Sequence, residues 1–210
     1  MTYLQLVNKV LVRLRENEVT TVGENSYSKL IGEYVNDAKR SVENAWDWTG
    51  LRNTLTVDTQ ANVFNYVLTD ADNTIKILDV TNDSNNFFLQ YRASQWFDNA
   101  FLDFASVPKG TSQYYSINGI NGVDLYPIPD KAYTLRFNVV LRTTDFTNDT
   151  DPLNIPFTPV VRLATALAAR ERGETGGTSA AELFALADAS MADAIAMDAA
   201  LHPEETIWYS

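Results

Sequence analysis

Residues 157–201, FTPVVRLATALAARERGETGGTSAAELFALADASMADAIAMDAAL, contain two helices in succession and decide the fold of this chain. Thr158 is a hydroxyl N-cap followed by Pro159 at the first helical position, and Gly173 is placed to end the first helix. The apolar residues of this helix repeat at three- and four-residue spacing. The loop 174–177 then leads to the second helix.

The second helix begins after Thr178 or Ser179, and Glu182 lies three residues beyond Ser179, as a capping box requires. Alanine and larger apolar residues occupy most of its faces. A helix with so little polar surface is usually buried. We therefore expect other helices to cover this pair.

The first fifty residues supply candidates for that cover. A capping box at Thr2 predicts a helix over about residues 3–16. Asn25 or Ser26 caps a longer amphipathic helix, and Gly50 is placed to stop it. The apolar positions of the longer helix keep helical spacing almost without a break: Tyr27, Leu30, Ile31, Tyr34, Val35, Ala38, Val42, Ala45 and Trp46.

After Arg52 the apolar period changes from helical to alternating, which predicts β-strands. Two Asn-Gly pairs within residues 118–122 suit the positive φ angles of a hairpin. Residues 93–104 interrupt the strands and predict a short helix that packs on the sheet. The expected strands cover residues 55–57, 63–68, 75–80, 87–91, 113–117, 123–126 and 133–141.

The order of elements predicts an α+β fold, since each helical pair would leave an apolar stripe exposed if it stood alone. We expect residues 1–51 and 152–201 to form one four-helix bundle. Residues 52–151 would form an inserted antiparallel β domain, sandwich or barrel-like, and residues 202–210 an extended C-terminal tail.

The composition narrows the classes of function. A formal net charge of -11 argues against a broad nucleic-acid-binding surface or binding to anionic membranes, although acidic walls can conduct DNA without holding it. The chain has no cysteine, so neither disulfides nor thiolate chemistry is possible. We expect no membrane span and no signal peptide.

The search for reactive groups points away from an enzyme. His202 is the only histidine and precedes a proline, without a fixed partner for general-base work. Asp145, Asp149 and Asp151 offer oxygen ligands for calcium, but the spacing is not that of an EF-hand, and a solvated linker is the alternative that we favour. We therefore expect no catalytic residue, no cofactor and no metal.

Large aromatic residues gather at two informative places. Trp46 and Trp48 follow the long helix and indicate packing between domains. Trp208 and Tyr209 place large apolar groups in the segment 202–210, where polar residues are usual. They either fold back on their own protomer or dock on another protein, and we expect docking.

At this point the chain resembles the head-to-tail adaptor proteins of tailed phages, the head-completion or tail tubular A-type proteins, particularly those of short-tailed phages. The likeness spans nearly the whole chain. It is carried by LVNKVL at 6–11, NDAKRSV at 36–42 with WDW at 46–48, DLYPIPD at 124–130 leading into YTLRF at 133–137, and IP at 155–156 before a helical pair broken by RGE at 172–174.

The resemblance implies a structural virion protein that forms a ring, generally of twelve copies, joining the portal at the capsid vertex to the tail nozzle. The ring would extend the channel through which DNA passes without specific binding, and would be assembled in the host cytoplasm. The family often grips the portal with its C-terminal segment, which here offers His202, Ile207, Trp208 and Tyr209. The loops of the β domain would contact the tail component, with Asn118, Asn121, Asp70 and Asn85 as candidates.

Acidic residues of the last helix are candidates for lining the channel. Glu182, Asp188 and Asp193, together with Asp198, do not share one helical face, so the sequence does not choose among them. The alternative function is a β-sandwich recognition module of a tail protein that binds a receptor or glycan. The aromatic hairpin and the Asn-rich loops of the β domain favour this alternative.

Overall fold

The structure is a computed structural model that describes residues 1–70, 73–102, 107–173 and 180–202. The fold is mixed α+β, as the sequence predicts. The chain divides into a helical unit, Met1–Leu51 with the described residues from Asp145 onward, and a β unit, Arg52–Thr144. Residues 145–151, which we expected in the β domain, belong to the helical unit.

The helical unit contains α1 (Tyr3–Arg13), α2 (Ser26–Ala45), α4 (Phe157–Arg172), α5 (Ala180–Ala199) and the short 3-10 helix η1 (Thr49–Leu51). Capping boxes hold the first turns of α1 and α2, with Thr2 and Asn25 as the N-caps. The left-handed conformation of Gly173, with a φ of 63°, ends α4 as predicted.

Helix α4 is the centre of this unit, because it packs on α1, α2 and α5. Its buried residues lie on more than one face: Pro159, Val160, Val161, Ala164, Thr165, Ala166, Ala168 and Ala169. Alanines on opposite faces let helices approach α4 from both sides.

The prediction that the last helix is buried is wrong for the chain as described. Only Ala187, Ser190 and Ala194 of α5 are buried, and these small residues face α4. Leu186 and Met197 are 50% and 76% exposed. Part of the apolar surface of α5 is therefore not covered by the described residues of the helical unit. The closed four-helix bundle stays a prediction.

Two predicted helix ends also differ from the structure. Helix α4 begins at Phe157 with Pro156 as its N-cap, so Thr158 lies inside the first turn and caps nothing. Helix α2 ends at Ala45, and Gly50 lies within η1. A Cβ atom on Gly50 would collide with the carbonyl oxygen of Asn154, so this glycine serves close packing.

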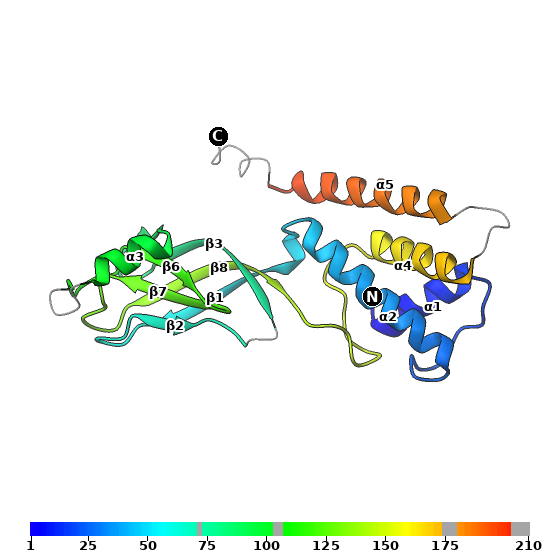
Figure 1. Cartoon of the computed structure of the whole chain (residues 1–210), viewed down its shortest axis with the longest axis horizontal. Helices are drawn as coiled ribbons and strands as arrows, with labels where there is room; N and C mark the ends of the chain where they lie inside the picture. The colour runs from blue at the N-terminus through cyan, green and yellow to red at the C-terminus, as the bar shows by residue number, and fades with distance from the viewer. Residues whose placement is uncertain (71–72, 103–106, 174–179, 203–210) are drawn as a thin grey trace. The chain divides into compact units, whose positions relative to one another are not determined.

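The β unit is a sandwich of two four-stranded sheets, without a closed barrel among its described residues (Figure 1). Within each sheet the strands pair antiparallel, except that β5 runs parallel to β6. One sheet has the order β1 (Arg52–Asp58), β8 (Thr134–Arg142), β3 (Thr74–Asn82), β4 (Phe87–Phe88), and the other β2 (Asn65–Val67), β7 (Gly122–Tyr126), β6 (Tyr114–Asn118), β5 (Gln90–Tyr91).

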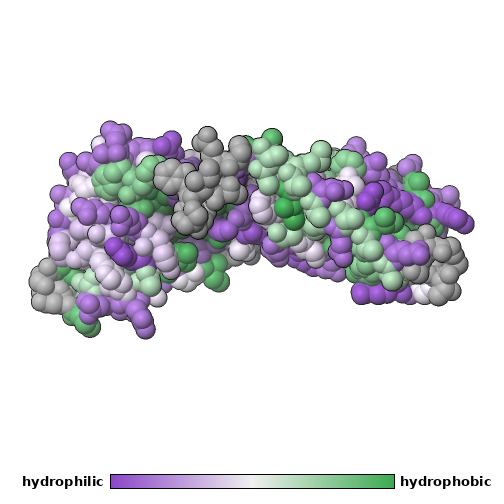
Figure 2. Space-filling view, turned by 90° about the horizontal axis from the view of Figure 1, so that it is seen from above, coloured by the Kyte–Doolittle hydropathy of each residue, from purple (hydrophilic) through white to green (hydrophobic). Residues whose placement is uncertain are grey.

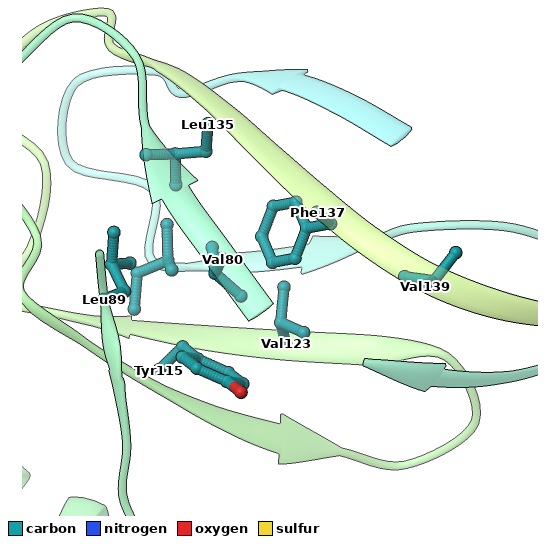
Figure 3. Close-up of a cluster of buried hydrophobic side chains, with 8 residues drawn as sticks. Val80, Leu89, Tyr115, Val123, Leu135, Phe137 and Val139 are labelled. Carbon is teal, nitrogen blue, oxygen red and sulfur yellow. The ribbon is translucent and has the colours of Figure 1, made fainter. Parts of the chain in front are cut away.

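Side chains from both sheets form the core of the sandwich. Leu135, Phe137 and Val139 alternate along β8 and are fully buried, as their spacing predicts. They meet Tyr115 and Val123 from the opposite sheet (Figure 3). This core gives the β unit an interior of its own.

The stretch 87–91 is not the single strand that we predicted. Residues Phe87–Phe88 pair with β3, whereas Gln90–Tyr91 pair with β6 in the other sheet. Leu89, which is buried, lies where the chain passes from one sheet to the other. Five apolar and polar residues in a row do not show where a strand changes sheets.

The expected short helix is α3 (Ser94–Phe101). The ring of its Trp96 lies 5.1 Å from that of Tyr114 and 5.2 Å from that of Tyr126. These contacts seat α3 on the face of β6 and β7 that points away from the core. The aromatic hairpin is therefore partly covered by its own chain.

Candidate functional site

The outer face of α5 is an apolar surface of the helical unit that lies exposed among the residues the structure describes. Green and pale green surface gathers over α5 in Figure 2. The exposed alanines recur at three- and four-residue spacing, so they form one stripe: Ala181, Ala185, Ala189, Ala192 and Ala196. Leu186 and Met197 flank it, and we call the whole the α5 outer face.

The acidic channel candidates border this face on two sides. Glu182 and Asp193 are exposed and lie on the same side of α5 as Leu186 and Met197. Their positions differ by 4, 7, 11 or 15 residues, and each of these spacings is close to a whole number of helical turns. Asp188 is exposed on the other side of the alanine stripe. The structure therefore does not bring the three carboxylates together.

Asp198 has a structural role. Its carboxylate accepts hydrogen bonds from the indole nitrogen of Trp46, at 3.0 Å, and from the backbone nitrogen of Thr49, at 3.1 Å. These bonds tie the last turn of α5 to the segment that follows α2. The other tryptophan of the WDW motif, Trp48, is fully buried and donates to the carbonyl of Val42 at 2.7 Å.

His202 is the one portal-binding candidate within the described residues, and it is anchored. Its Nε2 atom lies 2.8 Å from Oγ1 of Thr49, and its backbone nitrogen donates to the carbonyl of Ala199 at 3.1 Å. Ile207, Trp208 and Tyr209 lie outside the described residues, as do Thr178 and Ser179.

A groove of about 360 Å³ runs between α4 and α5. Most of its lining is apolar or small, with the guanidinium of Arg162 and the carboxylate of Asp193 among the exceptions. Arg162 also donates to the carbonyl of Leu186 at 3.1 Å. Burial lowers the pKa of the neighbouring Arg13, and the positive charge of Arg162 lowers it further. Two cations thus meet near this part of the helical unit.

The β-domain candidates fall at opposite ends of the sandwich. The loop ending at Asn73 precedes β3, whereas Asn85 lies in the turn that follows it, and β3 spans nine residues between them. The hairpin 118–121 lies with the first loop, since Nδ2 of Asn121 donates to the carbonyls of Asp70, at 2.8 Å, and Asn73, at 2.7 Å.

The amide of Asn121 is therefore used to hold two loops together, and its side chain is largely buried. Asn118 donates to the carboxylate of Asp124 at 3.0 Å from an exposed position. Asp70, Asn118 and Asn121 form one cluster. Asn85 is separate from it.

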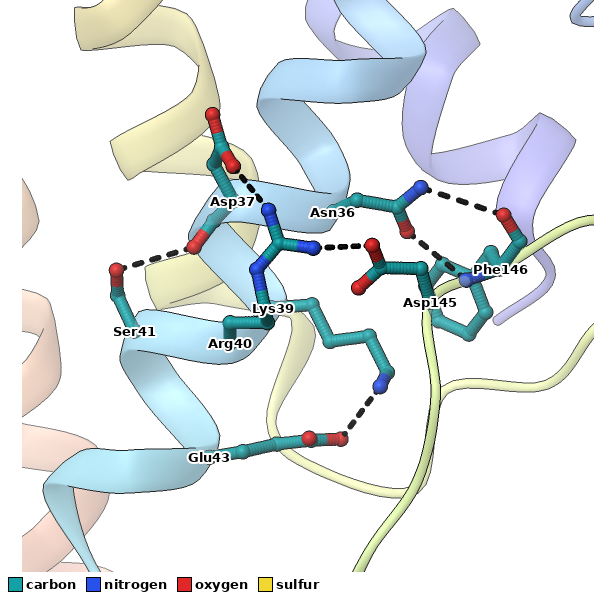
Figure 4. Close-up of polar contacts among 8 residues, drawn as sticks. All are labelled: Asn36, Asp37, Lys39, Arg40, Ser41, Glu43, Asp145 and Phe146. Carbon is teal, nitrogen blue, oxygen red and sulfur yellow. Dashed lines mark hydrogen bonds and ion pairs between the residues drawn. The ribbon is translucent and has the colours of Figure 1, made fainter. Parts of the chain in front are cut away.

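The three carboxylates considered for calcium are engaged separately. Asp145 pairs with Arg40, and this hydrogen bond raises the pKa of the Arg40 guanidinium (Figure 4). Asp149 accepts from the backbone of Val22 at 3.2 Å, and Asp151 caps its own turn. Among the described residues, no group of three or more histidine and acidic side chains is placed to hold a metal ion.

The segment after β8 is also fixed to α2 through a polar clasp. The amide of Asn36 exchanges two hydrogen bonds with the backbone of Phe146, at 3.0 and 3.2 Å. Below it, the ammonium of Lys39 lies 3.1 Å from the carboxylate of Glu43 and 5.3 Å from the ring centre of Phe146 (Figure 4). The return of the chain into the helical unit is therefore a defined structure.

Sequence reasoning missed the groove, whereas it did find apolar and small residues on more than one face of the last helix. The alanine spacing was visible, but it indicates a close-packed face equally well in a chain that covers the helix itself. Within the described ranges, no helix is long and apolar enough to cross a membrane.

Comparison with known proteins gives one result. The family model described as SU10 adaptor protein matches residues 1–204. No curated protein sequence matches the chain. Because the family model spans almost the whole sequence, through both units and all described helices and strands, this chain belongs to the SU10 adaptor protein family, whose members are structural adaptors of phage virions.

Proposed function

We propose that this virion protein is a head-to-tail adaptor without catalytic activity, which forms a ring, of twelve copies, between the portal and the tail nozzle. The ring assembles in the host cytoplasm and extends the channel for DNA ejection. The family match supports the adaptor role. The exposed α5 outer face is the structural observation that supports ring formation.

A ring needs lateral surfaces that one copy leaves exposed and a second copy buries. The α5 outer face has this character, since its alanines permit close approach of another helix and its two larger apolar side chains are exposed. A helix of this length offers a strip of only about 300 Å², against about 800 Å² per partner in a stable interface. Further surface of the chain must therefore contribute. In the assembly, the neighbouring copy would complete the helical bundle around α5.

The negative charge suits a passage for DNA. Glu182 and Asp193 share one side of α5, and the whole chain carries a formal net charge of -11. Carboxylates that face a lumen repel phosphate, so DNA slides without being held. Asp188, on the other side of the stripe, would lie in or beyond the lateral contact.

Two further surfaces are proposed to bind partners. The segment from His202 through Ile207, Trp208 and Tyr209 docks on the portal. The loops of the β unit contact the tail nozzle with one end of the sandwich, and Asn85 and Asn118 mark the two ends between which the choice lies. Asn85→Lys and Asn118→Lys, compared for binding to the nozzle protein, identify the end, since one substitution should weaken binding and the other should not.

Electron microscopy of the chain mixed with its portal tests the ring. Rings stacked on portals are expected for the unmodified protein. Ala192→Glu, which places a charge in the alanine stripe, should abolish them, whereas Ala132→Glu, at an exposed loop position of the β unit, should not. Portals that stay bare with folded, unmodified protein would contradict the proposal.

A second candidate function is glycan recognition by the β unit. A pocket of about 300 Å³ is lined by Phe88, Gln90, Gln113 and Tyr114, and aromatic faces beside amide groups suit sugars. Screening the full chain on a glycan array tests this candidate. Binding that Gln113→Ala abolishes would support it, and an array without signal would contradict it.

A further inference from the structure

The groove between α4 and α5 is lined by apolar residues that the described chain leaves open. Met197 and Leu201 form one wall, and they are 76% and 64% exposed. Pro156 and Pro159, from the start of α4, lie on the other side. Exposed apolar side chains that line a groove are typical of a site that binds a ligand or another polypeptide segment.

The eight residues 203–210 begin at the end of this groove. Leu201 lines it, and the next residue, His202, is tied to Thr49 at 2.8 Å. Pro203 has no backbone N–H and so cannot donate the next helical hydrogen bond. Eight residues reach up to about 26 Å when extended, whereas the groove from Leu201 back to Ser190 follows about 16 Å of helix.

The chemistry of this segment matches the groove. Ile207, Trp208 and Tyr209 supply large apolar groups for the walls, and the thioether of Met197 makes favourable contacts with aromatic rings. Glu204 and Glu205 supply carboxylates for the guanidinium of Arg162. Asp198, the acid at the same end of the groove, is already bonded to Trp46 and Thr49.

We propose that the groove between α4 and α5 holds residues 203–210 of the same chain while the protein is free. Trp208 and Tyr209 occupy the apolar walls, and the two glutamates approach Arg162. Because the segment is tethered at the groove, its effective concentration there is of the order of millimolar, which favours its own groove over that of a second copy. The proposal concerns the free chain and stands whether or not the segment later binds a portal.

The test labels the full chain with 5-fluorotryptophan and records ¹⁹F NMR spectra without portal. Trp208→Phe assigns the signal of Trp208. We expect this signal to be displaced and broadened relative to a peptide of residues 203–210. Met197→Glu should return it to the position of the peptide, because a charge replaces an apolar wall. Leu186→Glu, on the same helix but outside the groove, should leave it displaced.

Three results would overturn the proposal. They are a Trp208 signal at the peptide position in the unmodified chain, a displaced signal that Met197→Glu leaves unchanged, and a displacement lost on dilution, which would mean that a second copy supplies the groove. Retention of the three other tryptophan signals shows that each variant is folded.

A complementary measurement uses the peptide as a probe. A chain ending at His202 should bind the 203–210 peptide, and the same shortened chain with Met197→Glu should bind it at least roughly tenfold more weakly. If the shortened chain binds the peptide but the full chain does not bind the portal, the proposed portal docking is wrong and the proposed groove contact is supported. If the full chain binds the portal but the shortened chain does not bind the peptide, the proposed groove contact is wrong and the portal docking is supported.

Discussion

Helices α2 and α5 have the same length of twenty residues but differ in how much of their surface the rest of the chain buries. Helix α2 buries nine residues, four of them polar or charged, against α1, α4 and the segment after β8. Helix α5 buries three small residues, and two of its larger apolar side chains, Leu186 and Met197, are exposed. The comparison teaches that equal length and a regular helix do not determine burial: α2 is largely covered within one copy, whereas α5 keeps an apolar face exposed, as our proposed ring would need.

We expect the largest change in the free energy of unfolding from breaking the buried ion pair of α2. The side chains of Lys39 and Glu43 are 2% and 5% exposed. Lys39→Met leaves a carboxylate buried without its ammonium, which should lower the free energy of unfolding by about 3 to 5 kcal/mol. Urea denaturation measures the loss. Lys39→Met combined with Glu43→Leu should recover most of it, and a single variant as stable as the unmodified chain would show that the pair is unimportant.

Close packing of α2 on α1 comes next. A Cβ atom on Gly32 would collide with the hydroxyl of Tyr3 and lie 2.9 Å from Cγ1 of Val22. Gly32→Ala should therefore cost about 3 kcal/mol, the upper part of the range for overpacked sites. Gly23→Ala is the matched control, since its new Cβ would meet only Lys29 at 3.9 Å. Equal stability of the two variants would contradict the packing.

The same contact has a signature at high pH. Burial raises the pKa of Tyr3 to about 12 from 10.0, assisted by the charges of Glu33, Asp145 and Asp149. The folded state thus keeps the proton to higher pH than the unfolded chain. The contribution of the protonated Tyr3 hydroxyl to the free energy of unfolding is complete below pH 10 and is lost as the pH rises toward 12.

Tyr3→Phe should accordingly reduce the alkaline loss of unfolding free energy by about 2 kcal/mol, with little change at neutral pH. Urea denaturation of both proteins at neutral pH and across this alkaline window measures the effect. Parallel pH profiles for the two proteins would contradict an altered Tyr3.

The smallest effect on stability belongs to α5. Ala192→Glu on the exposed face should change the unfolding free energy of the free chain by less than about 0.5 kcal/mol. Ala187→Glu, on the face buried against α4, should cost at least about 2 kcal/mol, because it buries a charge. Thermal unfolding of both variants checks this pair. If Ala192→Glu is as damaging as Ala187→Glu, α5 is covered within its own chain and the comparison fails.

Much of the local structure was predictable. The capping box at Thr2, an N-cap at Asn25 or Ser26, the end of α4 at Gly173 and the alternation along β8 are signals carried by neighbouring residues. The structure has each of them, with Asn25 as the N-cap. The family resemblance was also correct, because it depended on motifs spread over the chain.

The candidate surfaces were predictable only in part. Asp188 and Asp193 of α5 are exposed, and their place in a channel stays a prediction. Asp198 is bonded to Trp46 and Thr49, which are distant in sequence. Asn121 was selected as a loop residue that would contact the tail component, and in the structure its amide holds the loop at Asp70. Such bonds join residues far apart along the chain, and residue type alone does not indicate them.

Periodicity and caps specify where helices and strands run, because those preferences arise from sterics and hydrogen bonds within a few residues. They specify how much apolar surface each element carries, but not which neighbour covers it. The packing of α4 between its neighbours, the crossing at Leu89 and the open face of α5 depend on how distant segments meet. The hydrophobic effect has no direction, so the same apolar stripe is satisfied by any surface that excludes water from it, whether in the same chain or in another copy.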